Sequence, residues 1–147
     1  MDCCLFALVF FMTSISVNDF SARTICLLNL FLFQILPFAL VRIKANLTPK
    51  STENCREGKF HYDHEFVGSR LPDGTLTSYT AIYYVNTNNG YTLFKDGNYK
   101  VDSVANRLVI FDSSKLHKAV DCTDEKTRVV INFNYFTHKY GTIDQYQ

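Results

Sequence analysis

Two histidines and one aspartate in this chain have the side chains and the order that a transition-metal site needs. His61 and Asp63 are separated by one residue, and His117 follows much later in the sequence. Two imidazole nitrogens and one carboxylate oxygen can hold Fe(II) on one face of the ion and leave the opposite positions open. The same ligands also suit zinc, so the ligand types alone leave both metals as alternatives.

The spacing of the first two ligand candidates fits an extended backbone. Residues two apart on a strand point to the same face, so an H-x-D motif delivers an imidazole and a carboxylate to one spot. His64 would point away from Asp63 and is left out of the site. His117 follows a strand and a polar turn, where a sandwich would bring a third ligand back to the first two. We expect the three ligand atoms within about 4 Å of one another, since metal–ligand bonds are about 2.0–2.2 Å long.

Arg128 is the fourth residue with a candidate chemical role. It opens the hydrophobic segment 128–136, and alternation places it on one face with Val130, Asn132 and Asn134. A planar guanidinium can bind a carboxylate through two parallel hydrogen bonds. The side chain is either at the rim in water or faces inward toward an anion, because burying an unpaired charge is costly.

Tyr84 lies on another predicted strand and can assist this arginine. By alternation it shares a face with Thr80 and Ile82. Its phenol can donate a hydrogen bond to the anion that Arg128 would bind. The alternative is a core aromatic residue whose hydroxyl lies at the edge of the sheet.

The elements that must position these side chains are predicted to be strands. Residues 41–47 alternate apolar and polar side chains, which is the period of a half-buried strand. Further segments are rich in the branched and aromatic residues typical of strands, namely 77–86, 91–94, 108–111, 115–119 and 128–136. Asn88-Asn89-Gly90 predicts a tight hairpin between the first two of these, because Asn and Gly accept positive φ. Short strands separated by turns indicate a mainly β fold, an antiparallel sandwich or barrel.

The bulk composition is that of one globular domain. The 147 residues carry a net charge of +1 and no run of basic residues, so there is no specific indication of nucleic-acid binding. The five cysteines are odd in number and form no C-x-x-C pair. This pattern argues against a disulfide framework or a zinc knuckle and favours a reducing compartment, so we expect a cytoplasmic protein.

Residues 1–39 form an apolar N-terminal segment that differs from the domain predicted over residues 40–147. The run 25–41, which ends two residues inside the predicted domain, is apolar except for Asn29 and Gln34, and its 17 residues are at the lower limit for a membrane span. We favour a supporting helix in which residues 25–36 pack on the outer face of the sheet. The alternatives are a membrane anchor through residues 25–41 and a non-native or mis-started N-terminus.

From about residue 40 to residue 136 the chain resembles the Fe(II)- and 2-oxoglutarate-dependent dioxygenases, in their prolyl-4-hydroxylase-like branch. The matching pieces are HYD at 61–63, AIYYVN at 81–86, GYTLF at 90–94, NRLVIFDSSKLH at 106–117 and RVVINFNYF at 128–136. This set is also similar to versions found in phage and marine microbial sequences. The resemblance implies a double-stranded β-helix, or jelly roll, with one or more N-terminal helices.

The resemblance also implies roles for individual residues. The three ligand candidates would bind Fe(II), and Arg128 would bind the distal carboxylate of 2-oxoglutarate with the help of Tyr84. Asn46, on the strand before the H-x-D motif, would make another contact to this co-substrate. Dioxygen would be the second co-substrate, and ascorbate a further cofactor. The implied reaction hydroxylates a C–H bond, in a prolyl or other peptidyl side chain or in a small molecule, and releases succinate and CO2.

Some positions depart from the pattern of these enzymes. Gly90-Tyr91-Thr92 stands where relatives often have two glycines before the threonine, and Ser103 and Asn106 stand where many have proline and glycine. Asn tolerates unusual backbone angles, so the turn at Asn106 can persist. The alternative function is a non-catalytic jelly-roll module, for binding or structure, derived from such an enzyme. An intact set of four candidate residues argues against that alternative.

Overall fold

The computed structural model describes residues 37–52, 56–63 and 76–138, and this part of the chain is mainly β. Its strands are β1 (Ala39–Pro49), β2 (Leu76–Tyr84), β3 (Tyr91–Phe94), β4 (Lys100–Asp102), β5 (Arg107–Asp112), β6 (His117–Val120) and β7 (Thr127–His138). A short 3-10 helix, η1 (Asp96–Asn98), connects β3 to β4. The strands predicted from alternation and composition are confirmed, with small shifts at their ends.

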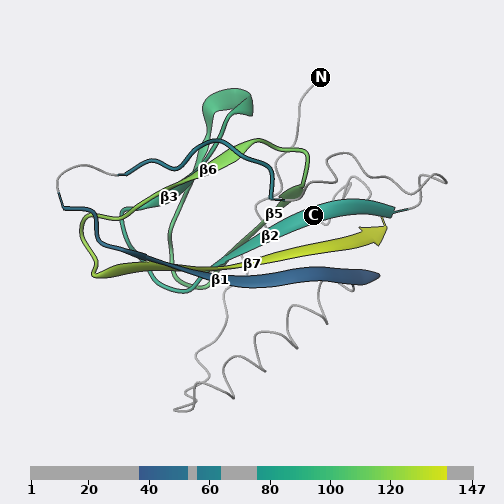
Figure 1. The fold of residues 1–147 in the computed structure, drawn as a ribbon, viewed down its shortest axis with the longest axis horizontal. Coiled ribbons are helices and arrows are strands. Elements are labelled where there is room, and N and C mark those ends of the chain that lie inside the picture. Colours follow the sequence, from purple (N-terminus) through teal and green to yellow (C-terminus); the bar gives the residue numbers. More distant parts are fainter. Residues whose placement is uncertain (1–36, 53–55, 64–75, 139–147) are drawn as a thin grey trace, which may run out of the picture.

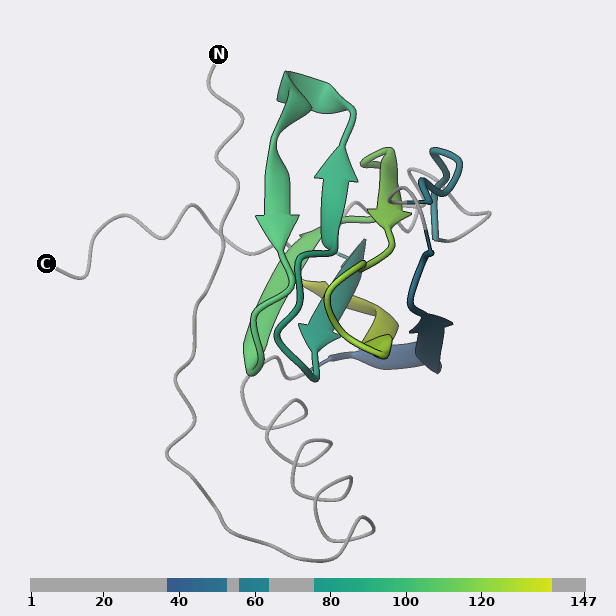
Figure 2. The same ribbon diagram turned by 90° about the vertical axis from the view of Figure 1, so that its left-hand side faces the viewer.

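The strands form two antiparallel sheets that lie one above the other (Figure 1). The larger sheet has the order β1-β7-β2-β5, and the smaller one has the order β4-β3-β6. Residues 56–63 run beside β6, to which Glu57 and His61 each form an isolated bridge. The view turned by 90° shows the smaller sheet standing over the larger one (Figure 2). The described residues thus have the jelly-roll-like architecture that was predicted.

The hydrophobic core lies between the two sheets. Alternation along each strand turns one set of apolar side chains toward the opposite layer. The buried residues of this cluster are Ile82, Tyr84, Phe94, Val101, Val109, Phe111 and Val130. Phe94 stands at its centre, with its ring edge-on to Phe111 at a centroid distance of 4.8 Å and stacked on Tyr99. The two layers are therefore held at a fixed spacing next to the cavity described below.

The predicted hairpin between residues 77–86 and 91–94 is wrong, because β2 and β3 belong to different sheets. The connecting loop crosses from one layer to the other. The Asn88 side chain stabilises this loop by donating to the carbonyl of Asn86 and accepting from the backbone N–H of Gly90. Its own backbone N–H donates to the carbonyl of Ser103, at 3.0 Å. These contacts outweigh the local preference of the Asn-Asn-Gly sequence for a two-residue hairpin turn.

Positive φ angles occur at other turns of the described residues. Gly97 has a φ of 76° within η1, and Asn106 has a φ of 67° at the turn before β5. The turn at Asn106 therefore exists in the form that its tolerance of unusual backbone angles predicted. The backbone N–H of Asn106 donates to the carbonyl of Tyr84 at 2.9 Å, which ties this turn to the end of β2.

The outer face of the larger sheet is apolar. On β7, Phe133 and Tyr135 alternate with the inward-facing asparagines and are buried there together with Ala81. Edge strand β1 adds Ile43 and Leu47, and the Leu47 side chain is 67% exposed. The exposed apolar side chains on this face are therefore those of β1, and exposed apolar side chains that lie together usually mark a contact face. The prediction that residues 25–36 pack on it lies outside the described residues and stays a prediction.

Strand β1 overlaps the end of the segment that was considered as a membrane anchor. Residues 39–41 of the proposed 25–41 span are part of this strand, which pairs with β7. Residues 25–36 of the proposed span lie outside the described residues, so the anchor alternative stays a prediction for them. Across the described ranges, the structure contains no helix with the length and apolar character to cross a membrane.

Deleting residues 1–36 should lower the melting temperature and increase binding of a hydrophobic dye. The physical reason is that the apolar outer face of the larger sheet would lose the cover we predict for it. Deleting only residues 1–24 is the matched control and should leave both properties close to those of the full chain. Equal melting temperatures for the full chain and the 1–36 deletion would contradict this prediction.

Candidate metal centre

The three ligand candidates meet at the edge of the smaller sheet. His61 pairs with His117, the first residue of β6, through backbone hydrogen bonds of 2.9 and 3.2 Å. This pairing places the two imidazole rings 4.8 Å apart between centroids. Asp63 follows at a bend, so the strand predicted around the H-x-D motif is reduced to a single bridge. Residues 64–75, which include His64, lie outside the described part of the chain.

The hydrogen bonds of the two histidines determine which ring nitrogen is available to a metal. Nδ1 of His61 lies 2.9 Å from the carbonyl oxygen of Lys59, and Nδ1 of His117 lies 3.0 Å from that of Lys115. A carbonyl oxygen only accepts, so each Nδ1 carries the proton and donates it. In a neutral imidazole the lone pair is then on Nε2, which is the form that ligates metals.

Both Nε2 atoms point at the carboxylate of Asp63. The Nε2 of His61 is 3.4 Å from Oδ1, and the Nε2 of His117 is 3.6 Å from Oδ2. Burial opposes ionisation of Asp63, but the hydrogen bonds from His117 and His61 hold its pKa well below the usual range. Asp63 in turn raises the pKa of His61. When both imidazoles are neutral, three acceptor groups converge here and need a cation among them, which is either a proton on an imidazole, as in these hydrogen bonds to Asp63, or a metal ion.

The donor set fits a divalent transition metal. One ligand atom from each of His61, Asp63 and His117 lies within 4.8 Å of the other two. This separation is somewhat wider than the expected 4 Å. The His61 side chain is 50% exposed, whereas those of Asp63 and His117 are 5% and 3% exposed. The cluster is therefore enclosed on one side and reachable from solvent on the other.

The ring of His117 is fixed by aromatic neighbours. Phe111 packs edge-on to it at 4.8 Å, and Phe94 lies at 5.9 Å. These contacts come from strands of both sheets, so the imidazole cannot turn without disturbing the core. His117 is the best-anchored of the three candidates because its ladder pairing, its Nδ1 hydrogen bond and its ring contacts all agree.

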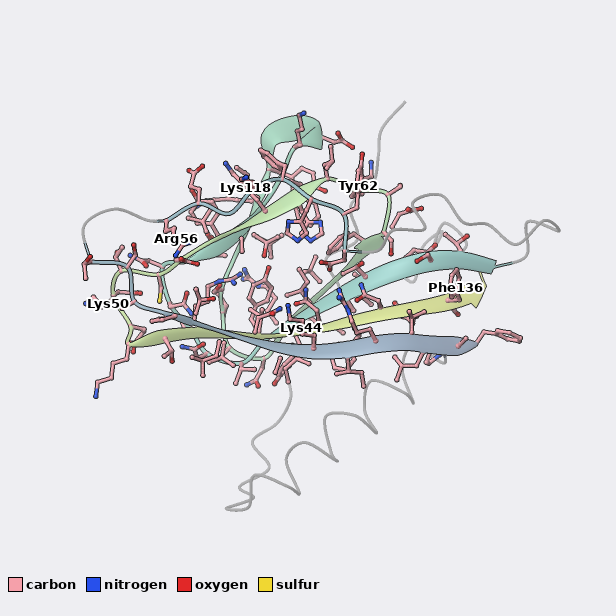
Figure 3. All side chains as sticks on the ribbon, in the orientation of Figure 1. Lys44, Lys50, Arg56, Tyr62, Lys118 and Phe136 are labelled. Atoms are coloured by element: carbon pink, nitrogen blue, oxygen red, sulfur yellow. The ribbon has the colours of Figure 1, made fainter. Side chains whose placement is uncertain are left out.

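A cavity of about 260 Å³ extends from this cluster between the sheets. This volume is near the lower end of the roughly 300–1,000 Å³ typical of small-molecule sites. Besides the three ligand candidates it is lined by Arg42, Lys44, Asn46, Thr48, Ile82, Thr92, Ala119, Arg128, Val130 and Asn132. Figure 3 labels Lys44 on β1, which is a strand of the larger sheet, and this sheet borders the cavity on one side. The predicted residues Asn46 and Arg128 thus share a cavity with the ligand cluster.

Arg128 faces inward and is only 2% exposed. Its Nε donates to the hydroxyl of Ser103 at 3.0 Å, and its Nη2 donates to the hydroxyl of Thr92 at 3.3 Å. Burial lowers its pKa, yet a guanidinium keeps its charge in proteins. No carboxylate of the described residues forms an ion pair with it. Of the two positions considered from sequence, the inward one is therefore correct, and among the described residues this buried cation has no carboxylate partner.

Tyr84 helps to hold the Arg128 side chain in place. Its ring lies 5.7 Å from the guanidinium carbon, and its hydroxyl donates to Thr92 at 2.8 Å. Burial raises the pKa of Tyr84, so the phenol stays protonated. The Thr92 oxygen accepts from both Tyr84 and Arg128, which leaves its own O–H as a donor. A hydrogen bond from Tyr84 to a bound anion stays a prediction, whereas Thr92 is a site residue that the sequence analysis missed.

Gly90 permits the close approach of Arg128 to this loop. A Cβ added at Gly90 would lie 2.8 Å from Cδ of Arg128 and 2.8 Å from the carbonyl oxygen of Val120. Gly90→Ala should therefore displace Arg128 and lower the free energy of unfolding by about 1–3 kcal/mol, the usual cost of overpacking. Chemical denaturation measures this change.

Gly58→Ala is the matched control for Gly90→Ala. Its added Cβ would approach no described atom more closely than 3.2 Å, at the carbonyl oxygen of Ala119. Its cost should be clearly smaller than that of Gly90→Ala. Equal stability of Gly90→Ala and the wild type would show that the loop tolerates a side chain at this position.

Comparison with known proteins places this geometry on a known fold. No family model matches the chain, and no curated protein matches it. Among solved structures, the non-heme alpha ketoglutarate dependent epimerase SnoN from nogalamycin biosynthesis is similar at 13% identity with a TM-score of 0.50. That match covers 82% of this chain and 57% of SnoN.

Two further solved structures are similar at lower TM-scores. The non-heme monooxygenase ThoJ, in a nickel complex, has 12% identity and a TM-score of 0.48 over 70% of this chain and 47% of its own. A prolyl-4-hydroxylase from Pseudomonas putida has 20% identity and a TM-score of 0.46 over 84% of this chain and 70% of its own. The chain spans about half the length of ThoJ and somewhat more of SnoN. At these identities the likeness concerns the fold, which this chain shares with SnoN.

Proposed function

We propose that this protein is an Fe(II)- and 2-oxoglutarate-dependent dioxygenase that hydroxylates a C–H bond and releases succinate and CO2. The observation that carries the proposal is a single cavity that needs a cation at one end and an anion at the other. At one end, three acceptors from His61, Asp63 and His117 need a cation. At the other end, the buried guanidinium of Arg128 needs an anion. A metal-bound dicarboxylate satisfies both ends at once.

The metal would be held by Nε2 of both histidines and by the carboxylate of Asp63. Bound Fe(II) would supply the activation of dioxygen that is coupled to decarboxylation of 2-oxoglutarate. The chain's own contribution is to keep both Nδ1 protons on backbone carbonyls, so that both lone pairs face the metal. The protein ligands would occupy one face only, which leaves coordination positions open toward the cavity.

The distal carboxylate of 2-oxoglutarate would be bound by Arg128 and Thr92. Arg128 uses only part of its donor fork on Ser103 and Thr92, and a guanidinium has five N–H donors. Thr92 retains its O–H as a donor to the same anion. Asn46 lines the cavity and would make a further contact, while Tyr84 holds Arg128 and Thr92 in position. Exclusion of water from this end would strengthen the charge-assisted hydrogen bonds.

The primary substrate would enter from the open side beside His61. A prolyl or other peptidyl side chain is proposed from the motif resemblance, and a small molecule fits the same chemistry. SnoN, which shares its fold with this chain, is an alpha ketoglutarate dependent epimerase, and this supports the choice of co-substrate. The cysteine pattern supports a cytoplasmic location.

Release of succinate from 2-oxoglutarate tests this proposal directly. The purified full chain should release succinate only when Fe(II) and dioxygen are both supplied, and Asp63→Ala should abolish the release. If the wild type releases none and binds no divalent metal, the non-catalytic jelly-roll module becomes the better reading of the fold.

Metal binding can be measured separately from turnover. Isothermal titration with Mn²⁺, a redox-stable substitute for Fe(II), should give one site per chain in the wild type and none in His117→Ala, because removing one of three ligands leaves an incomplete face. Tyr62→Ala is the matched control, since Tyr62 lies between two ligands in the sequence and is exposed. Tight Zn²⁺ binding with negligible Mn²⁺ binding would favour the zinc alternative.

Arg128→Ala should weaken binding of 2-oxoglutarate to the Mn²⁺-loaded protein while the Mn²⁺ affinity persists. A hydrogen bond to a charged group contributes roughly 1.5–3 kcal/mol, which corresponds to about 10- to 150-fold in affinity. Arg128→Lys should lose less, because it keeps the charge but not the planar fork. Titration calorimetry gives both constants, and equal affinities in wild type and Arg128→Ala would rule out this carboxylate assignment.

A further inference from the structure

Asp63 is held by two residues outside the ligand set. The side-chain amide of Asn132 donates from Nδ2 to Oδ2 of Asp63 at 3.3 Å. The guanidinium of Arg42 donates from Nη2 to the backbone oxygen of Asp63 at 3.0 Å. We propose that Asn132, assisted by Arg42, is a positioning residue that orients the Asp63 carboxylate for the metal. This inference rests on the proposed metal site.

Asp63 needs such support more than the other two ligand candidates. His117 is part of β6 and pairs with Phe94 across the smaller sheet, and His61 pairs with His117. Asp63 lies at a bend just beyond that bridge, where no ladder pairing in the described part of the chain fixes its backbone. Within the described residues, and apart from its contacts with the two histidines, its orientation is therefore set by the hydrogen bonds that Asn132 and Arg42 supply.

Asn132 is well placed to impose an orientation. It lies in the middle of β7, paired with Lys44 on one side and with Ile82 on the other. It lines the cavity and is only 9% exposed. A side chain on the central part of a four-stranded sheet is a rigid point of attachment, in contrast to the irregular segment that carries Asp63.

The amide of Asn132 can face Asp63 in one sense only. An ionised carboxylate accepts hydrogen bonds and donates none, so the NH2 group must be turned toward it. The Oδ1 atom is then buried without a hydrogen-bond partner among the described residues. A buried unpaired acceptor is unfavourable, and turning the amide around would place two acceptors against each other. The contact with Asp63 therefore dictates how this amide is oriented.

Arg42 connects the segment that carries Asp63 to the cavity-facing side of the larger sheet. Its Nε donates to Oδ1 of Asn134 at 3.1 Å, and Nδ2 of Asn134 donates to the hydroxyl of Thr80 at 3.1 Å. Thr80 lies 3.2 Å from the hydroxyl of Ser113. A line of hydrogen bonds thus runs from the loop after β5 through β2 and β7 to edge strand β1 and ends at Asp63.

The consequence is that metal affinity should depend on a residue that does not touch the metal. Loss of partners that orient metal ligands typically costs about 10–100-fold in metal affinity. Asn132→Leu keeps the approximate size of the side chain and removes the donor. We expect Mn²⁺ binding about 10–100-fold weaker than in the wild type, and a changed visible absorption spectrum for bound Co²⁺.

Asn86→Leu is the matched control for a purely structural effect. Asn86 bonds the start of β7 by donating to the carbonyl of Thr127 and accepting from the N–H of Val129, and neither Asn86 nor these partners is a metal-ligand candidate or bonded to Asp63 in the described residues. It should lower the melting temperature of the metal-free protein yet keep the wild-type Mn²⁺ affinity and Co²⁺ spectrum. Loss of Mn²⁺ affinity in both variants, in proportion to their loss of stability, would overturn the inference.

The outcomes separate this inference from the proposed function. If the wild type binds Mn²⁺ and Asn132→Leu binds it equally well, the positioning role is wrong and the metal site stands. If the wild type binds no divalent metal, the proposed function is wrong and this inference is overturned with it. Should Asn132→Leu fail to fold, Arg42→Met on the exposed edge strand decides, with weaker Mn²⁺ binding expected and wild-type binding contradicting the role.

Discussion

The convergence of three hydrogen-bond acceptors is the constraint on which the rest of this structure depends. Each Nδ1 is committed to a backbone carbonyl, from Lys59 and Lys115, so both Nε2 lone pairs face Asp63. Such a cluster is stable only around a cation. The two bridges that bind residues 56–63 to β6 bring these groups together, and the aromatic core prevents the ring of His117 from turning away. Packing and backbone pairing thus hold together three groups that need a cation among them.

On the larger sheet, the buried cation Arg128 is the counterpart of the three acceptors at the edge of the smaller sheet. The chain buries this cation behind Ser103, Thr92 and Tyr84 and provides no carboxylate for it among the described residues. Gly90 is needed because the arginine stem occupies the volume that a Cβ would take. A structural arginine would be expected to have a buried partner, since unpaired burial of a charge is unfavourable. Under the proposed function, the three ligand candidates and the buried guanidinium are therefore the two ends of one binding site.

Periodicity explains what could be predicted from the sequence. The grouping of residues on the two faces of β1, β2 and β7 follows from a period of two. Periodicity left the inward position of Arg128 as one of two alternatives, and it did not indicate which face of β1 meets the cavity, so the place of Asn46 there comes from the structure. The prediction of a hairpin after β2 was wrong because the buried contacts of Asn88 and the close approach of Arg128 to Gly90 override the local turn preference. Thr92 and Asn132 were missed as site residues because alternation gives the face of a strand but not which face of another sheet it meets. That information lies in the stacking of the layers.

Edge strand β1 links the two faces of the larger sheet. Its inward residues, among them Arg42 and Asn46, line the cavity, whereas Ile43 and Leu47 point outward. A register irregularity between Leu40 and Arg42 sets which residues take each role, because a slip of one residue exchanges the two faces of a strand. The outward-facing apolar residues of β1 therefore have a second role besides forming a contact face. Its burial would oppose slippage of β1, and in doing so would keep the guanidinium that bonds Asp63 on the side of the metal site.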